Sequence, residues 1–487
     1  MSSDFQPPPP PFPATIPHTK VIATIGPASE GRIGEMIEAG MSVARINLSH
    51  GTEEDFLRRV ALIRREADAR MRAVGILTDI PGPKMRMGRF AGGVRTLRDG
   101  ERLRLRRRGA GVAKQDEVEL DFDGFLEAVR PGHRVILADG QAELVAETIE
   151  SDAIVARVSR AGDVGDRKGV HFPDSKLAYD LPSEHDKKHL ALANEAGVDM
   201  IGASFVSRPD EIRAIRALVP GLCVIAKIER MAALANIDAI LGEADGIMVA
   251  RGDLGVEAEL EQLPLIQKSL IASTLRAGKF AITATEMLES MVDSSRPTRA
   301  EVTDVANAVL DGSDAVMLSA ETAVGEHPVE AVATMARIAR AVETSQRYQD
   351  LPRPTFRISE ANFGNATALA AVQAAEALGI TKIVCFTETG NSVRQVSRYR
   401  PSAEVFALSP HLRTVNQMTV LAHVRPMLFR RERSLEEMLH MASEMLLVRG
   451  MARAGDAIVF VAGVPPGISR TTNVMKLHHI GEEVKLH

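Results

Sequence analysis

Two residues of opposite charge stand two positions apart within one apolar run. Lys227 and Glu229 belong to the segment Val-Ile-Ala-Lys-Ile-Glu. Side chains two apart on a β-strand point to the same side, so these two would share one site if the run is a strand. An isolated Lys-x-Glu is most often a structural ion pair. In an active site, the lysine would instead stabilise negative charge that develops on a substrate.

A second carboxylate favours the catalytic interpretation. Asp253 lies in Ala-Arg-Gly-Asp-Leu-Gly, where Gly252 and Gly255 would let the backbone approach a ligand closely. Arg-Gly-Asp taken alone is equally typical of an ordinary turn. However, Mg²⁺ commonly takes two carboxylates from protein and fills its other positions with water and substrate oxygens. Glu229 and Asp253 together therefore predict a magnesium site.

Further polar side chains stand at the ends of apolar runs. Because the carboxyl ends of parallel strands meet at one rim of a sheet or barrel, we expect them to converge. A random scatter of polar residues would not follow this pattern. The residues are Arg45, Asn47 and His50, then Asp79, then Thr285, and finally Ser319 with Glu321.

The elements that must position these residues are eight short apolar runs separated by stretches of helical period. Buried runs without an alternating polar face are typical of a closed parallel barrel, with a doubly wound open sheet as the alternative. The runs are Val21 to Gly26, Ser42 to Leu48, Ala73 to Ile80, Met200 to Phe205, Cys223 to Ile228, Gly246 to Ala250, Phe280 to Thr285 and Ala315 to Ser319.

The connection after the third run is far longer than a barrel requires. We therefore predict a (β/α)8 TIM barrel over residues 18–88 and 170–344, interrupted by a small β-barrel domain over 89–169. A C-terminal α/β domain is expected over 345–487, where helix and strand alternate again. Residues 1–17 are rich in proline and predict a disordered or polyproline arm.

Composition excludes several classes of protein. No apolar run is long enough to span a membrane, and no basic segment followed by an apolar stretch opens the chain. The formal charge of −5, with 59 basic and 64 acidic residues, does not favour nucleic acid as a partner. The two cysteines, Cys223 and Cys385, lie in apolar runs, which fits a reducing cytoplasm without disulfides.

Several long segments, in order, resemble pyruvate kinase. Three of them are Thr19 to Pro27, Ala44 to Gly51 (Ala-Arg-Ile-Asn-Leu-Ser-His-Gly) and Thr283 to Met291 (Thr-Ala-Thr-Glu-Met-Leu-Glu-Ser-Met). Others are Ser295 to Gly312, Met317 to Ala323 and Arg167 to Val170. The resemblance runs from about residue 18 to the end and is far more specific than one short motif.

The resemblance implies Mg²⁺- or Mn²⁺-dependent phosphoryl transfer from phosphoenolpyruvate to ADP in glycolysis, giving pyruvate and ATP. Lys227 would stabilise the transferring phosphoryl group and the enolate, while Glu229 and Asp253 would hold the metal. Arg45 would clamp phosphate. Substrate binding would further involve Gly252 and Thr285, and Thr285, Ser319 and Glu321 would shape the water path that protonates the enolate.

The resemblance also assigns the nucleotide site. Asn47, His50 and Arg86 would face ADP, joined by Lys168 at the end of the inserted domain. The insertion would then act as a lid that excludes water from the substrates.

One departure concerns K⁺. Many relatives have Asp-Thr-Lys-Gly-Pro-Glu after the third strand, whereas this chain has Asp-Ile-Pro-Gly-Pro-Lys, ending at Lys84. Asn47, Ser49 and Asp79 match the family's K⁺ ligands, but a tethered ammonium can replace a monovalent ion. We therefore expect activity without K⁺.

Regulation and assembly are implied by resemblance alone. The segment Thr-Glu-Thr-Gly-Asn-Ser is similar to a phosphate-holding effector loop, which would use Thr387, Thr389, Asn391 and Ser392 for a phosphorylated metabolite. The segment from Gly463 to Arg470 has fewer glycines than is usual in the family, so the identity of any effector stays open. A homotetramer is expected.

Two other hypotheses remain. A carbon–carbon lyase or mutase could use the same paired carboxylates on an enolate, but it would not explain the inserted domain with Arg167, Lys168 and Gly169. A catalytically silent regulatory subunit would be favoured by loss of Lys227, of a metal carboxylate or of Thr285. All of these residues are present.

Overall fold

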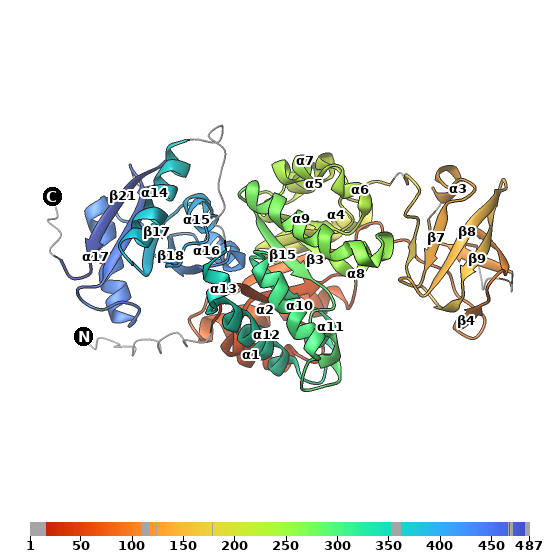
Figure 1. Cartoon of the computed structure of the whole chain (residues 1–487), viewed down its shortest axis with the longest axis horizontal. Helices are drawn as coiled ribbons and strands as arrows, with labels where there is room; N and C mark the ends of the chain where they lie inside the picture. The colour runs from red at the N-terminus through yellow and green to blue at the C-terminus, as the bar shows by residue number, and fades with distance from the viewer. Residues whose placement is uncertain are drawn as a thin grey trace.

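The computed structural model describes residues 16–109, 114, 116–122, 124–177, 179–351, 362–465, 467 and 471–482. The predicted N-terminal arm lies almost entirely outside these residues. Figure 1 shows a central barrel, with an inserted β domain on one side and a C-terminal domain on the other. No helix in the described part of the chain is long and apolar enough to cross a membrane.

Eight parallel strands form a closed barrel in the order β1-β16-β15-β14-β13-β12-β3-β2. The closed barrel confirms the predicted fold class and excludes the open sheet. The strands are β1 (Lys20–Thr24), β2 (Met41–Asn47), β3 (Gly75–Ile80), β12 (Met200–Ala203), β13 (Cys223–Ile228), β14 (Gly246–Ala250), β15 (Phe280–Ala284) and β16 (Ala315–Leu318).

Helices surround the barrel, and side chains that bond the first backbone N–H groups fix where several of them begin. Thr52 and Asp55 form a capping box at α2, and Thr298 and Glu301 form another at α10. The main helices are α1 (Ile33–Ala39), α2 (Glu53–Ala69), α4 (Glu184–Glu195), α5 (Pro209–Leu218), α7 (Ile237–Glu243), α9 (Leu263–Arg276), α10 (Arg299–Leu310) and α12 (Pro328–Glu343). Shorter ones are α6 (Met231–Leu234), α8 (Arg251–Glu257), α11 (Ala320–Ala323) and α13 (Gln346–Gln349).

The inserted domain is a curled six-stranded sheet, order β11-β7-β8-β9-β5-β6, with a two-stranded sheet of β10 and β4. We call it the lid. β11 (Val170–His171) lies just beyond the predicted end of the insertion and pairs antiparallel with β7. The other elements are β4 (Val94–Leu97), β5 (Arg102–Arg107), β6 (Glu117–Leu120), α3 (Phe125–Ala128), β7 (Arg134–Leu137), β8 (Ala142–Ile149), β9 (Ala153–Arg160) and β10 (Gly162–Gly165).

The C-terminal domain has a five-stranded sheet in the order β19-β18-β17-β20-β21, with β21 antiparallel to β20. It packs on the end of the barrel where the strands begin, as shown by the bond from Lys20 Nζ to the carbonyl oxygen of Val424 at 2.7 Å. Its elements are α14 (Phe363–Ala377), β17 (Lys382–Phe386), α15 (Asn391–Ser397), β18 (Glu404–Ser409), α16 (Leu412–Gln417), β19 (Val424–Leu428), α17 (Leu435–Val448), β20 (Ala457–Gly463) and β21 (Thr472–His479).

Candidate active site

A buried ammonium group lies among polar groups at the carboxyl end of the barrel. Nζ of Lys227 lies 2.8 Å from Oε1 of Glu229, 3.2 Å from Oδ2 of Asp79 and 2.8 Å from Oγ of Ser204. These side chains come from three neighbouring strands or the loops after them. A Cβ at Gly202 would lie 2.2 Å from Oδ1 of Asp79, so only glycine allows this close packing.

Burial and charge act against each other on these groups. Burial alone would lower the pKa of Lys227, but Asp79 and Glu229 outweigh it and hold the pKa above its usual value. Burial likewise opposes ionisation of Asp79, yet the cations Arg45 and Lys227 lower its pKa. The pKa of Glu229 is raised, mainly by burial and also by the charge of Asp253. Lys227 is therefore charged. Of the two carboxylates beside it, Glu229 has its negative charge less well balanced by nearby cations than Asp79.

Arg45 is buried beside the same cluster. Its Nε and Nη2 donate to Oδ2 of Asp79 at 3.1 and 2.8 Å, and its Nη1 donates to Oγ1 of Thr24 at 3.0 Å. A guanidinium has five N–H donors, so two remain beyond these three contacts. The side chain is thus held in place and can still bind an anion.

Asp253, the second predicted metal ligand, lies in the first turn of α8 after β14. Its Oδ1 is 3.0 Å from Nζ of Lys84, and the same ammonium is 3.8 Å from Oδ1 of Asp139 in the lid. The described ion pairs of Lys84 are thus with Asp253 and Asp139, rather than with Asp79. Of the other predicted K⁺ ligands, Asn47 accepts a bond at Oδ1 from the backbone N–H of Ser49, at 3.0 Å.

The loop after β15 holds Thr285 in an unusual backbone conformation. Thr285 and Glu286 have φ angles of 70° and 53°, a region that β-branched residues rarely adopt. The hydroxyl of Thr285 accepts a hydrogen bond from the backbone N–H of Gly252 at 2.7 Å and donates to the carbonyl oxygen of Ala284 at 2.6 Å. Gly252 therefore contacts Thr285 directly.

Arg251 supports this turn through hydrogen bonds to its backbone. Its Nη2 donates to the carbonyl oxygen of Thr285 at 2.6 Å, and its Nη1 pairs with Asp304 of α10 at 2.6 Å. The same guanidinium also reaches the carbonyl oxygens of Ala284 and Glu286, both at 3.3 Å.

Glu321 ties two loops of the mouth together. It is fully buried, and its two oxygens accept the backbone N–H groups of Ser319 at 2.6 Å and of Leu288 at 3.1 Å. Glu321 thus links the end of β16 to the loop that carries Thr285.

The predicted nucleotide residues Asn47 and Arg86 are half-buried. His50 and Lys168 are exposed. Arg86 lies where the chain enters the lid, and its Nη1 donates to the carbonyl oxygen of Arg167 at 3.2 Å. Both ends of the insertion are joined there, because Met87 bonds through its backbone N–H to Lys168 at 2.9 Å.

Comparison with known proteins assigns the family. Residues 16–332 match the sequence model of the pyruvate kinase barrel domain, and residues 365–478 match that of the pyruvate kinase alpha/beta domain. A pyruvate kinase of Methylorubrum extorquens is 39% identical over 468 residues, covering 96% of this chain and 98% of the relative. One of Mycobacterium tuberculosis is 38% identical over 470 residues, covering 95% and 98%.

The chain belongs to the pyruvate kinase family. A crystal structure of a pyruvate kinase from Cryptosporidium parvum has the same architecture, with a TM-score of 0.87 and 33% identity, and the match covers 95% of this chain and 96% of the other. Family membership confirms the predicted enzyme class, a transferase of glycolysis. It also removes the grounds for a lyase.

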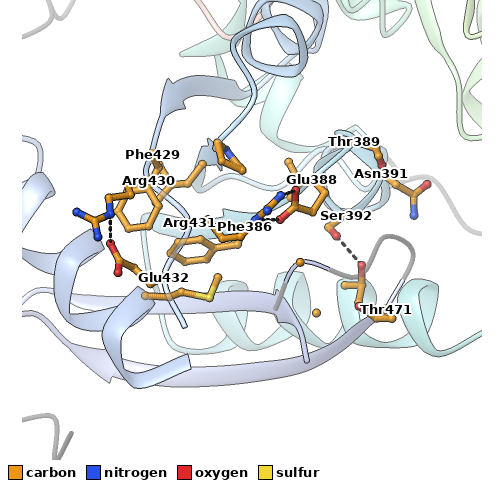
Figure 2. A pocket seen from close by; sticks show the side chains of 17 residues that line it. Phe386, Glu388, Thr389, Asn391, Ser392, Phe429, Arg430, Arg431, Glu432 and Thr471 are labelled. Carbon is orange, nitrogen blue, oxygen red and sulfur yellow. Dashed lines mark hydrogen bonds and ion pairs between the residues drawn. The ribbon is translucent and has the colours of Figure 1, made fainter. Parts of the chain in front are cut away.

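The chain also has a pocket in its C-terminal domain, around the predicted effector loop. Figure 2 shows Glu388 and Arg431 directed toward each other within it. Oε2 of Glu388 is 2.6 Å from Arg431 and 2.8 Å from Nε2 of His411. Phe386 and Phe429 contribute apolar walls, and Thr389, Asn391 and Ser392 line the opposite side.

The effector-loop residues make contacts of their own. Oγ1 of Thr387 accepts the backbone N–H of Gly390 at 2.8 Å, and the hydroxyls of Ser392 and Thr472 lie 2.5 Å apart. In the later loop, Pro466 and residues 468–470 lie outside the described residues.

Sequence reasoning missed three groups beside the mouth. Arg251 could have been identified from the sequence, because it is a charged residue at the end of a strand and directly precedes Gly252. Asp304 lies on a helix and His171 on the lid, and their proximity to the mouth depends on the folded chain.

Proposed function

We propose that this enzyme transfers the phosphoryl group of phosphoenolpyruvate to ADP, giving pyruvate and ATP, with Mg²⁺ held by Glu229 and Asp253. The observation that carries the proposal is the buried ammonium of Lys227, fixed between Glu229 and Asp79 at the barrel mouth. A fixed positive charge in a site of low dielectric stabilises the charge that develops during phosphoryl transfer.

The carboxylates are suited to a divalent cation. Glu229 is buried and its pKa is raised by burial, so its ionised form needs more compensation than Lys227 provides. Asp253 is close enough for its charge to raise that pKa further. Oxygen ligands of this kind favour Mg²⁺ or Mn²⁺. When bound, the metal would neutralise phosphate charge and polarise the substrate oxygens.

The protein's own groups would orient phosphoenolpyruvate. Arg45 has two N–H donors beyond those used by Asp79 and Thr24, so it can clamp the phosphate without leaving its place. Gly252 and Thr285 would bind the other end of the substrate. The bond between them supports a shared role.

Protonation of the enolate would involve the loops of Thr285 and Ser319. Both carboxylate oxygens of Glu321 accept hydrogen bonds from backbone N–H groups. This supports a positioning role for Glu321 in that water path. The proton itself would reach the substrate through water beside the hydroxyls.

ADP would bind between the barrel rim and the base of the lid. Asn47, His50, Arg86 and Lys168 would contact it, which is consistent with the exposure of His50 and Lys168. The backbone bond between Met87 and Lys168 supports a hinge at this point, about which the lid could close and exclude water.

We further propose that K⁺ is not required. The ammonium of Lys84 lies 3.0 Å from Oδ1 of Asp253, so a positive charge already reaches the carboxylates without a free ion. Arg45 and Lys227 compensate Asp79, one of the predicted K⁺ ligands.

Assembly, regulation and location rest on family resemblance. We propose a homotetramer that acts in the cytoplasm, where the buried and unpaired Cys223 and Cys385 would stay reduced. The pocket around Thr387 to Ser392 is the proposed site for a phosphorylated effector.

The test is pyruvate formation from phosphoenolpyruvate, ADP and Mg²⁺ in buffer free of Na⁺ and K⁺, and again with K⁺. We expect equal activity in the two buffers and a loss of at least about 10³-fold in Lys227→Met. Lys187→Met, which removes an exposed lysine, is the matched control. Absence of pyruvate in both buffers would reject the function, whereas activity only with K⁺ would reject the role of Lys84.

A further inference from the structure

Three potential metal ligands meet where the lid contacts the barrel. Asp139 lies in the turn between β7 and β8, and His171 lies on β11, so both belong to the lid sheet. Asp253 belongs to the barrel. One ligand atom from each of the three lies within 4.8 Å of the other two.

The imidazole of His171 points between the two carboxylates. Its Nε2 is 3.9 Å from Oδ1 of Asp139 and 3.9 Å from Oδ1 of Asp253. The residue is only 4% exposed, and this nitrogen makes no hydrogen bond within the described part of the chain. A buried polar nitrogen that forms no hydrogen bond is costly, so its position between two anions requires an explanation.

A cation already lies at this place. Nζ of Lys84 is 3.0 Å from Oδ1 of Asp253 and 3.8 Å from Oδ1 of Asp139. Gly169 makes room for it, because a Cβ there would lie 2.6 Å from Oδ1 of Asp139 and 3.3 Å from Cε of Lys84. The side chain of Lys84 is 27% exposed and can therefore turn outward.

We propose that Asp139, His171 and Asp253 bind a divalent transition-metal cation, such as Mn²⁺ or Zn²⁺, in exchange for the ammonium of Lys84. Metal–ligand distances of about 2.0–2.6 Å place neighbouring ligand atoms roughly 3–4 Å apart, which matches the spacing of His171 from both carboxylates. An imidazole ligand favours transition metals over Mg²⁺.

Such an ion would hold the lid against the barrel, since two of its ligands come from the lid and one from the barrel. The site shares Asp253 with the proposed magnesium site but does not need Glu229. It also differs in chemistry, because the magnesium site offers oxygen ligands alone whereas this one includes a nitrogen.

The test uses the full-length protein, freed of metal and loaded with Mn²⁺, and pulsed electron paramagnetic resonance. We expect modulation from a directly bound ¹⁴N in the wild type and in Glu229→Gln, and its loss in His171→Asn. His440→Asn changes an exposed histidine of the C-terminal domain and should keep the signal. A wild type without nitrogen modulation, or a His171→Asn protein that retains it, would overturn the proposal.

A second variant tests the exchange even if His171→Asn does not fold. Lys84→Met removes the competing ammonium, so the Kd for Mn²⁺ should fall at least about tenfold. Lys187→Met should bind Mn²⁺ like the wild type. An unchanged or weaker affinity in Lys84→Met would contradict the exchange of Lys84 for a metal.

Discussion

The guanidinium of Arg251 donates to the carbonyl oxygen of Thr285 across 2.6 Å, at the carboxyl end of β15. Thr285 has a φ angle of 70°, and strain of this kind costs about 1–3 kcal/mol per residue. Arg251 offsets that cost, and Asp304 holds Arg251 in place at 2.6 Å. The position of the Thr285 hydroxyl therefore depends on the ion pair of Arg251 and Asp304.

We predict that Arg251→Lys lowers kcat about 10- to 100-fold with a smaller change in KM, because one ammonium nitrogen cannot replace the three guanidinium nitrogens that contact the turn and Asp304. Asp304→Asn should lower kcat less. Steady-state kinetics and thermal melting of each variant provide the measurement. Arg213→Lys, in an exposed pair with Glu243, is the control. A normal kcat in Arg251→Lys would show that other contacts suffice to hold the turn.

Glu229→Gln should weaken Mg²⁺ binding. An amide keeps the shape of the side chain but loses the charge, so we expect the Mg²⁺ concentration for half-maximal activity to rise at least about tenfold. Glu326→Gln changes an exposed carboxylate of the barrel and should have no effect. An unchanged Mg²⁺ requirement in Glu229→Gln would mean that the metal binds elsewhere.

Lys84→Gln should create a requirement for K⁺. The substitution removes the ammonium beside Asp253 and Asp139, leaving their charge to be balanced from solution. We expect activity in K⁺-free buffer to fall at least about tenfold and to recover in part when K⁺ is added. The same assays on Lys187→Gln should show no dependence on K⁺. Equal activity of Lys84→Gln in both buffers would leave Lys84 without the proposed role.

Most of the barrel could be predicted from the sequence, because a strand buried on both faces must be a continuous apolar run. Thus β13 and β14 have the predicted bounds, and the other barrel strands differ by one or two residues. Two strands of the C-terminal sheet, β19 and β21, are not evident from the sequence. β19 contains Pro426, a residue that sheets confine to edge strands, and β21 (Thr-Asn-Val-Met-Lys-Leu-His-His) mixes polar and apolar residues without a regular alternation.

The proximity of Lys227 and Glu229 could be predicted, because both residues lie at the end of one strand. The candidate site was not predictable where its contacts depend on the approach of distant segments. Asp304 reaches Arg251 from a helix, and His171 reaches Asp253 only because the lid folds back on the barrel. Nor could the sequence reveal that Lys84 pairs with Asp253 rather than facing Asp79.

The C-terminal pocket should bind anions better when its internal carboxylate is removed. Glu388 pairs with Arg431 and His411, so a phosphate must compete with its carboxylate for these two side chains. We predict that Glu388→Ala increases the affinity for inorganic phosphate at least about tenfold, measured by calorimetry. Glu326→Ala is the control. Equal affinity in Glu388→Ala and the wild type would indicate that phosphate does not use Arg431.

His18 should make the enzyme sensitive to acid. Burial, reinforced by the nearby cations Lys20 and Arg425, lowers the pKa of His18 from 6.5 to about 4. Above pH 6.5 the imidazole is neutral in the folded and unfolded states, so it has no effect there. As the pH falls from 6.5 to 4, only the unfolded state gains the proton. The free energy of unfolding therefore falls by about 2–3 kcal/mol.

His18→Phe retains a ring that can stack on His423, as His18 does at 4.5 Å between ring centroids, but removes this titration. We therefore expect the melting temperature of the wild type to fall more steeply than that of His18→Phe between pH 6.5 and 4, with parallel curves above pH 7. His440→Asn, which changes an exposed histidine of the C-terminal domain, is the control variant. If His18→Phe and the wild type lose stability equally over this range, other groups cause the acid sensitivity and His18 is protonated in the folded state.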